Sequence, residues 1–193
     1  SSGILIGPSF PPFSSLSSFM LYNTNFKASS DLFFSMQVIS RHNLRNDTIR
    51  AFESSILSTF GVELSGSTYE LVELSHPEID LVLLDKEPLA CYIDGIPSLT
   101  VKGANTYVPS KNIVVVDQGA IRFVSNGADI MKPGITRVDS SIEPGDLVIV
   151  LEETHEKALC IGRSIVPDTD MLGSSGKAIE SIHYVGDELY HFF

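Results

Sequence analysis

The sequence predicts an α+β module, one helix packed on an antiparallel meander, followed by a mostly β module that forms a small, partly closed barrel. Three observations predict this division. Apolar residues recur at helical spacing between Arg45 and Gly61, short strand-like runs follow from Tyr69 to Ile93, and after Ile113 short strands alternate with Gly and Pro. With 193 residues, 43% of them hydrophobic, the chain is long enough for one ordinary domain or two small ones.

The helix of the first module is predicted from apolar residues spaced three and four apart. Asn46 or Asp47 is expected to cap its start, and Gly61 suits a left-handed residue at its end. The residues that set the spacing are Ile49, Phe52, Ile56 and Phe60.

The meander is predicted from short runs separated by turn residues. YELVEL (69–74) alternates, 79–84 is continuously apolar, DKEP (85–88) is expected to turn, and 89–93 forms another strand before the tight hairpin signal Asp94-Gly95. This module is expected to cover residues 36–110 and to end near Val108-Pro109.

The second module, residues 111–193, opens with a fully apolar run, Ile113 to Val116, which is typical of a buried strand. Asp117 is expected to cap a helix of about two turns that ends at Asn126-Gly127. Pro133-Gly134 and Pro144-Gly145 are expected to form type II turns. Further strands are predicted at 146–151, 158–165, 178–184 and 189–193.

Residues 1–35 differ in composition, with dense Ser and Pro and no charged residue before Lys27. A secretory signal would need a basic start and a longer apolar core. We expect a tail, natural or added, with Met36 as a candidate natural start, and assign it no function.

The formal net charge of −11 argues against indiscriminate binding of polyanions, because Lys and Arg supply most non-specific affinity for phosphate. It is compatible with recognition by shape, with a ribonucleoprotein partner, or simply with solubility. Cys91 and Cys160 lie in separate apolar runs and are expected to be buried, reduced thiols. Since this pair offers no disulfide framework, we expect an intracellular, cytoplasmic protein. No apolar run approaches the length of a membrane span, so we expect no membrane partner.

Four motifs in order carry a family resemblance: VDQGAIRFVSNGADIMKPGI (116–135), EPGDLVIV (143–150), ALCIGR (158–163) and GKAIESIHYVGDELY (176–190). They resemble the PUA domain, named for pseudouridine synthases and archaeosine transglycosylases. The whole chain is similar in architecture to stand-alone archaeal PUA proteins and to the malignant T-cell-amplified sequence family, although upstream similarity is weak in detail. The resemblance implies a PUA pseudo-barrel that binds structured RNA, either tRNA or small-subunit rRNA, in translation initiation or recycling.

The resemblance also implies which surface binds RNA, namely the short helix with the following loop and strand. Glycines without Cβ atoms let an RNA backbone approach and let peptide N–H groups point at phosphate, while Arg122 and Lys132 are the expected phosphate donors. Asp117 is expected to be a helix cap rather than a ligand, and core packing is an equal alternative for Met131 and Ile135. The residues carried over are Gly119, Ala120, Arg122, Asn126, Gly127, Ala128, Met131, Lys132, Pro133 and Gly134.

One departure concerns charge. Residues 112–193 hold six Lys or Arg against thirteen Asp or Glu, a difference of −7, so the salt dependence of RNA binding should be shallow. Help from the first module or from a partner is therefore expected.

Enzyme signals are thin. The five histidines show no zinc spacing, and His183 is expected to be a core or edge histidine. GSSGKA (173–178) lacks the spacing of a phosphate loop and is expected to be a turn. We expect no catalysis, no cofactor and no metal.

Two other functions stay open. The acidic chain could be a protein-interaction adaptor that docks a translation factor or the small ribosomal subunit. It could also be an accessory subunit of an RNA-modifying enzyme, a hypothesis that rests on analogy with the name-giving families.

Overall fold

A computed structural model describes residues 36–76 and 78–192. The expected tail, residues 1–35, lies outside the described residues.

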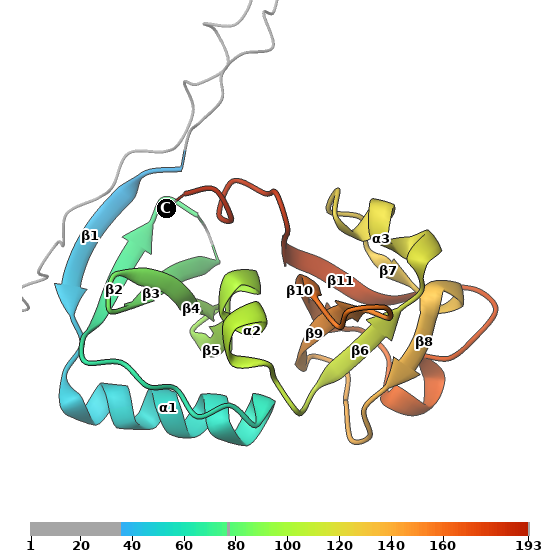
Figure 1. Cartoon of the computed structure of the whole chain (residues 1–193), viewed down its shortest axis with the longest axis horizontal. Helices are drawn as coiled ribbons and strands as arrows, with labels where there is room; N and C mark the ends of the chain where they lie inside the picture. Colours follow the sequence, from blue (N-terminus) through green and yellow to red (C-terminus); the bar gives the residue numbers. More distant parts are fainter. Residues whose placement is uncertain (1–35, 77, 193) are drawn as a thin grey trace, which may run out of the picture. The chain divides into compact units, whose positions relative to one another are not determined.

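The first part of the described chain is a five-stranded antiparallel sheet with two helices (Figure 1). Its strands lie in chain order, each paired antiparallel with the next. The elements are β1 Val38–Asn43, α1 Asn46–Phe60, β2 Tyr69–Leu74, β3 Ile79–Leu84, β4 Glu87–Ile93, β5 Ile96–Leu99 and α2 Val101–Tyr107.

Helix α1 forms as its apolar spacing predicts, with Phe52, Ile56 and Phe60 buried. It ends at Gly61, which has φ +67°, so the predicted left-handed stop is confirmed. The predicted start is wrong by one or two residues. Arg45 is the N-cap and no side chain caps the helix, while the Asp47 carboxylate accepts the N–H of its neighbour Thr48.

Two tight turns set the register of the meander. Asp94 and Gly95 both have positive φ, as a type I′ hairpin requires, and join β4 to β5. Asp85 and Lys86 do the same between β3 and β4. The turn predicted over 85–88 is therefore only two residues long, and β4 begins at Glu87.

Strand β1 and helix α2 were not predicted. In α2, the Thr100 hydroxyl accepts the N–H of Gly103 and donates to the carbonyl of Pro88, which fixes the helix start against β4. Gly103 is buried, and a Cβ there would lie 1.7 Å from the carbonyl oxygen of Leu89. The helix therefore packs on β4 at backbone contact distance.

The second part is a six-stranded sheet in the order β7-β11-β10-β9-β6-β8, in which β6 and β9 are parallel (Figure 1). Its edge strands β7 and β8 are joined by three residues, so the sheet must curl until its two edges meet. The elements are β6 Ile113–Val116, α3 Gln118–Val124, β7 Ile130–Met131, η1 Lys132–Gly134, β8 Ile135–Val138, β9 Leu147–Glu152, β10 Ala158–Ser164, η2 Asp168–Asp170 and β11 Lys177–Tyr184.

Strands β6 and β9 are buried on both faces, which explains their continuous apolar sequences. Val114, Val116, Val148 and Val150 face a core inside the curled sheet. Their alternate neighbours, Ile113, Val115, Leu147, Ile149 and Leu151, belong to a second core shared with α1 and the first sheet. The alternation of side chains along a strand therefore connects the two sheets through one apolar layer.

The turns around the second sheet are partly as predicted. Pro144-Gly145 is a type II turn, with Gly145 at φ +99° and the Asp146 N–H donated to the Glu143 carbonyl. Pro133-Gly134 is not: these residues form the 3-10 turn η1, and Gly134 lacks the positive φ that a type II turn needs. Strands β7 and β8, on either side of η1, were not predicted.

The strand predicted over 189–193 is wrong for its described part. Residues 189–191 form turns because the Asp187 carboxylate accepts the backbone N–H groups of Tyr184 and Tyr190 and bends the chain after β11. Leu189 is then buried in the shared core, where Tyr190 and Phe192 pack beside it. The apolar residues of this segment therefore cover the shared core and do not form a strand.

Candidate functional site

Helix α3 begins where β6 ends, and its start is fixed by Asp117. The Asp117 Oδ1 atom accepts the N–H of Ala120 at 2.8 Å, so the predicted cap is confirmed. The Asp117 N–H donates to the carbonyl of Gly134 at 2.9 Å. Asp117 thus connects the start of α3 to η1.

The α3 cavity is a mostly apolar hollow of about 400 Å³ between α3 and the β7–η1 segment. It exists because Gly119, Ala120, Ala128 and Gly134 have almost no side chain. Its large exposed hydrophobic side chains are Phe123, 65% exposed, and Met131, 49% exposed. The full lining is Asp117, Gly119, Ala120, Phe123, Val124, Ala128, Asp129, Ile130, Met131, Pro133 and Gly134.

Six of the ten residues carried over from the resemblance line this cavity, although 15 residues of chain separate the first from the last. Core packing was the equal alternative for Met131 and for Ile135; Met131 is exposed, whereas Ile135 is buried. The six are Gly119, Ala120, Ala128, Met131, Pro133 and Gly134.

The other four lie elsewhere. Lys132 pairs with Asp170, 2.8 Å away, and its side chain is only 14% exposed. The Asn126 side chain donates to the carbonyl of Arg122 and closes the end of α3. Gly127 has φ +81°, and a Cβ there would lie 2.6 Å from the ring of Tyr184, so its glycine is needed for packing. Arg122 is exposed on the opposite flank of α3.

Phe123 was not among the residues predicted for the RNA-binding surface. Phe123 precedes the buried Val124, and neighbouring helical residues point about 100° apart, so Phe123 is turned away from the core. The sequence did contain a signal for it: a short capped helix in which Phe123 stands next to the buried Val124. Asp129 was also missed, because its partners come from β11, about fifty residues later.

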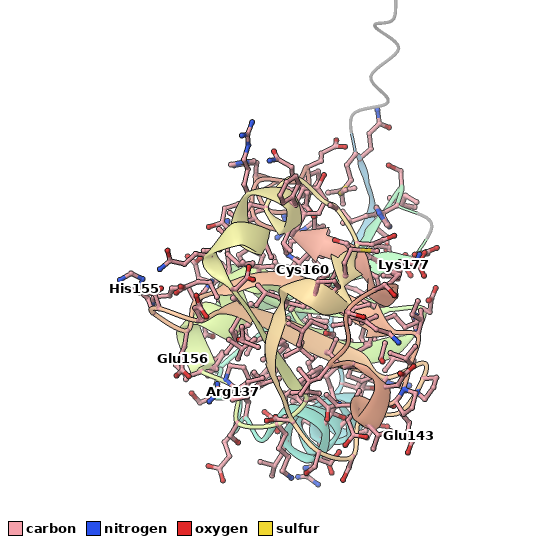
Figure 2. The ribbon with its side chains drawn as sticks, turned by 90° about the vertical axis from the view of Figure 1, so that its right-hand side faces the viewer. Arg137, Glu143, His155, Glu156, Cys160 and Lys177 are labelled. Carbon is pink, nitrogen blue, oxygen red and sulfur yellow. The ribbon has the colours of Figure 1, made fainter. Side chains whose placement is uncertain are left out.

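Asp129 is the cavity's second carboxylate, after Asp117. The backbone N–H of Ser181 lowers the pKa of the Asp129 carboxyl below its ordinary value, against the effect of burial, and the ammonium group of Lys177, 3.0 Å away, lowers it further (Lys177 is labelled in Figure 2). No Lys or Arg is among the lining residues. The cavity is therefore suited to an apolar or aromatic group rather than to a phosphate.

The amides at the start of α3 are also largely used. The N–H of Gln118 donates to Glu153 at 3.2 Å, and that of Ala120 donates to Asp117. The peptide N–H groups of Gln118 and Ala120 therefore do not point at a ligand, contrary to expectation.

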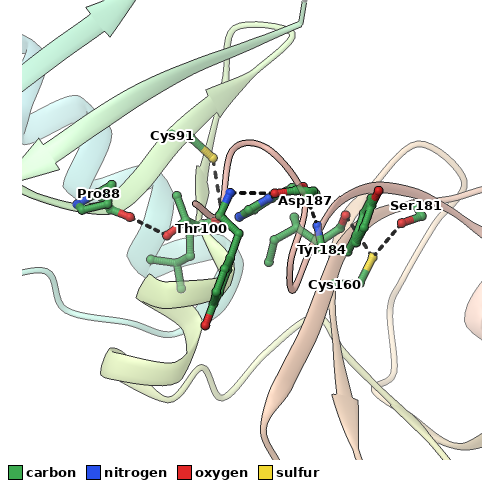
Figure 3. Close-up of polar contacts among 11 residues, drawn as sticks. Pro88, Cys91, Thr100, Cys160, Ser181, Tyr184 and Asp187 are labelled. Carbon is green, nitrogen blue, oxygen red and sulfur yellow. Dashed lines mark hydrogen bonds and ion pairs between the residues drawn. The ribbon is translucent and has the colours of Figure 1, made fainter. Parts of the chain in front are cut away.

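Two potentially reactive side chains, Cys160 and His183, make structural contacts. Burial raises the pKa of the Cys160 thiol to about 12, and its sulfur contacts the Ser181 hydroxyl (Figure 3). His183 is 1% exposed and pairs with Asp187, as expected of a core histidine. Within residues 36–76 and 78–192 no three His, Cys, Asp or Glu side chains are arranged to hold a metal. The helices of this part are too short or too polar to span a membrane.

Comparison with known proteins identifies this chain as a PUA-domain protein. A family model described as the PUA domain matches residues 112–185. An uncharacterized protein of Methanocaldococcus jannaschii is 42% identical over 116 residues, a match that covers 60% of this chain and 72% of that protein. A conserved PUA domain protein from Thermoplasma acidophilum superimposes with a TM-score of 0.69 and 26% identity over 80% of this chain and 99% of its own.

Eukaryotic relatives match a shorter part. Translation machinery-associated protein 20 of Saccharomyces cerevisiae is 36% identical over 50% of this chain and 56% of its own length. Malignant T-cell-amplified sequence 1 of Rattus norvegicus is 38% identical over 39% of this chain and 44% of its own length. This chain thus matches about half the length of these relatives. It belongs to the family of PUA-domain proteins that includes the archaeal stand-alone PUA proteins and the malignant T-cell-amplified sequence proteins.

Proposed function

We propose that this protein binds structured RNA, tRNA or small-subunit rRNA, by placing an unpaired base in the α3 cavity. The observation that carries the proposal is an apolar hollow with an exposed phenylalanine, in an acidic protein, built from six of the residues carried over from the PUA motif. Its volume falls within the range of about 300–1,000 Å³ that is usual for ligand pockets.

The chemistry fits a base better than it fits a phosphate. Sequence-specific proteins recognise RNA mostly at unpaired bases, which stack on aromatic side chains. Phe123 is the aromatic side chain in the lining, and Met131 adds a polarizable thioether. Of the two acids of the lining, Asp129 is paired with Lys177 at 3.0 Å, which balances its negative charge, and Asp117 accepts the N–H of Ala120.

The cellular role is carried over from relatives. The yeast relative is named for association with the translation machinery. We propose that this chain acts in the same process, in the cytoplasm, at initiation or recycling, as a binding protein without catalysis or cofactor. The small ribosomal subunit or a translation factor is the proposed partner.

The test is RNA binding by the full chain and by Phe123→Ala, measured by fluorescence anisotropy with tRNA and with rRNA fragments. Stacking contributes about 1–3 kcal/mol per base, so Phe123→Ala should weaken binding by about 5- to 150-fold. Leu57→Ala is the matched control, because Leu57 is an apolar side chain exposed by 43% on α1. Equal affinities of Phe123→Ala and the wild type would contradict the proposal.

The adaptor function has one observation in its favour. Of the six basic residues in 112–192, four are paired with carboxylates, which leaves little charge for RNA: Lys132, Arg137, Arg163 and Lys177. A pull-down from nuclease-treated extract separates the two functions, because a protein partner retained without RNA favours the adaptor.

A further inference from the structure

Two basic residues in the second part of the described chain lack a carboxylate partner. Within residues 112–192, Arg122 and Lys157 are the Lys and Arg side chains with no carboxylate oxygen within 4.0 Å. Arg122 is on α3, and Lys157 closes the turn between β9 and β10. Neither lines the α3 cavity.

Arg122 lines a second depression, the hairpin groove, of about 460 Å³, between α3 and the β9–β10 turn. Its other lining residues are Gln118, Ile121, Glu152, Thr154 and His155. Residues 118, 121 and 122 share one helix face, whereas 119, 120, 123 and 124 line the α3 cavity. Helix α3 is therefore a ridge with an apolar hollow on one flank and a polar groove on the other.

The carboxylates of Glu152 and Glu153 at the groove already accept hydrogen bonds from backbone N–H groups. Glu152 is 6% exposed, and its oxygens accept the N–H groups of Thr154, His155 and Lys157. Burial raises the pKa of the Glu152 carboxyl, but these N–H groups outweigh burial and hold it below its ordinary value. Glu153 accepts the N–H of Gln118.

The groups left facing outward can donate hydrogen bonds. Gln118 Nε2 lies 3.1 Å from the Thr154 hydroxyl, so the helix and the turn are tied together and their donors are held in place. Arg122 is exposed, and the His155 side chain is 76% exposed and projects outward from the turn (Figure 2), with its Nδ1 atom 3.5 Å from Glu152 Oε1. A guanidinium, a hydroxyl, an amide and an imidazole form a set that suits a phosphate oxygen.

We propose that the hairpin groove binds a backbone phosphate of the RNA whose base enters the α3 cavity, so that the strand crosses α3. This inference rests on the proposed function and extends it. An RNA strand can cross α3 near Gly119 and Ala120, because these residues have no large side chain. Arg122, Gln118 and Thr154 supply the phosphate contacts.

The test separates charge from stacking through salt dependence. The probe is an RNA hairpin with an unpaired loop, and binding to the full chain is measured over a range of salt concentrations. Each phosphate contact contributes about 0.7 to the slope of log affinity against log salt for a single strand. Arg122→Gln should lower the slope by about this amount, and Thr154→Val should weaken binding with less change of slope. Phe123→Ala should weaken binding at every salt concentration without changing the slope.

Arg50→Gln is the matched control, because Arg50 is exposed on α1 and the same charge is removed. The same hairpin with abasic loop nucleotides keeps the phosphates and should retain the Arg122-dependent slope. An unchanged slope in Arg122→Gln, or an equal fall in Arg50→Gln, would overturn the groove while leaving base binding in place. Absence of RNA binding by the wild type would overturn the proposed function itself.

Discussion

At the scale of single residues, the same side-chain types serve binding and packing, and only their partners distinguish the two. Arg122 and Lys132 were expected to act alike, as phosphate donors. Lys132 instead lies against Asp170, with its stem beside Gly173 and Gly176, whereas Arg122 projects from α3. Because Asp170 is 38 residues from Lys132, no local pattern could have shown this. Reversing the charge of Lys132 would test stability as much as RNA binding.

Asp187 gives a prediction about pH. Burial raises the pKa of its carboxyl, but hydrogen bonds from His183, Tyr184 N–H and Tyr190 N–H outweigh burial, so the pKa lies below its ordinary value. A carboxyl with a lowered pKa in the folded state contributes stability above the unfolded pKa, about 3.9 for Asp, and loses it as pH falls through the folded value. Asp187→Asn should therefore cost about 2–4 kcal/mol at neutral pH and progressively less below about pH 4.

Urea unfolding of the wild type and of Asp187→Asn across this pH range measures that difference. Asp47→Asn is the matched control, because Asp47 is exposed at the start of α1. A gap between Asp187→Asn and the wild type that stays constant from neutral pH to about pH 3 would show that Asp187 does not titrate as described.

At the scale of elements, helix α2 shows what tertiary contact adds to sequence. VKGANTY (101–107) contains Gly, Asn and β-branched residues, all poor helix formers, so no helix was predicted. It forms because Thr100 caps it and Gly103 lets it lie on β4. Intrinsic propensity alone would make Ala better than Gly in a helix by about 1 kcal/mol.

Gly103→Ala should instead destabilise the protein. The added Cβ would lie 1.7 Å from the Leu89 carbonyl oxygen, a backbone atom that cannot rotate away, so we expect a loss of about 3 kcal/mol. Denaturant unfolding measures it, and Thr106→Ala on the exposed side of α2 should stay within about 1 kcal/mol. If Gly103→Ala were as stable as the wild type, α2 could not pack on β4 at this distance.

Most of the remaining elements followed from local pattern. The long strands, the α1 stop, the Asp117 cap and the two-residue hairpin at Asp94-Gly95 rest on periodicity and turn chemistry. β1 exposes most of its residues, β8 exposes two of its four, and β7 has only two residues, so these edge strands lack a strong apolar pattern. For the candidate site, the motif brought six residues to one cavity, while Phe123 and the hairpin groove required the fold, because β9 and α3 meet only in space.

At the scale of the whole described molecule, the two sheets share one apolar layer and specific polar links. Asn105 in α2 exchanges two hydrogen bonds with the backbone of Ala158 in β10, as a neighbouring strand would. Arg163 pairs with Asp94 of the first sheet at 2.5 Å. The α3 cavity and the first sheet are therefore connected through β6, β9 and β10, because the core that contains Ile113, Val115 and Ile149 also contains residues of the first sheet.

The shared layer predicts that one substitution destabilises the full chain much more than a fragment. Residues 111–193 alone would expose the outer face of β6 and β9, so the fragment should bind a hydrophobic dye, unfold at lower temperature and associate. Ile149 is fully buried in the full chain, where Ile149→Thr should cost about 2–4 kcal/mol. In the fragment the same change places a hydroxyl in water and should reduce dye binding with little loss of stability. Dye fluorescence and thermal unfolding of the four proteins provide the comparison. If Ile149→Thr were equally harmful in both contexts, the β9 outer face would not depend on the first sheet for its burial.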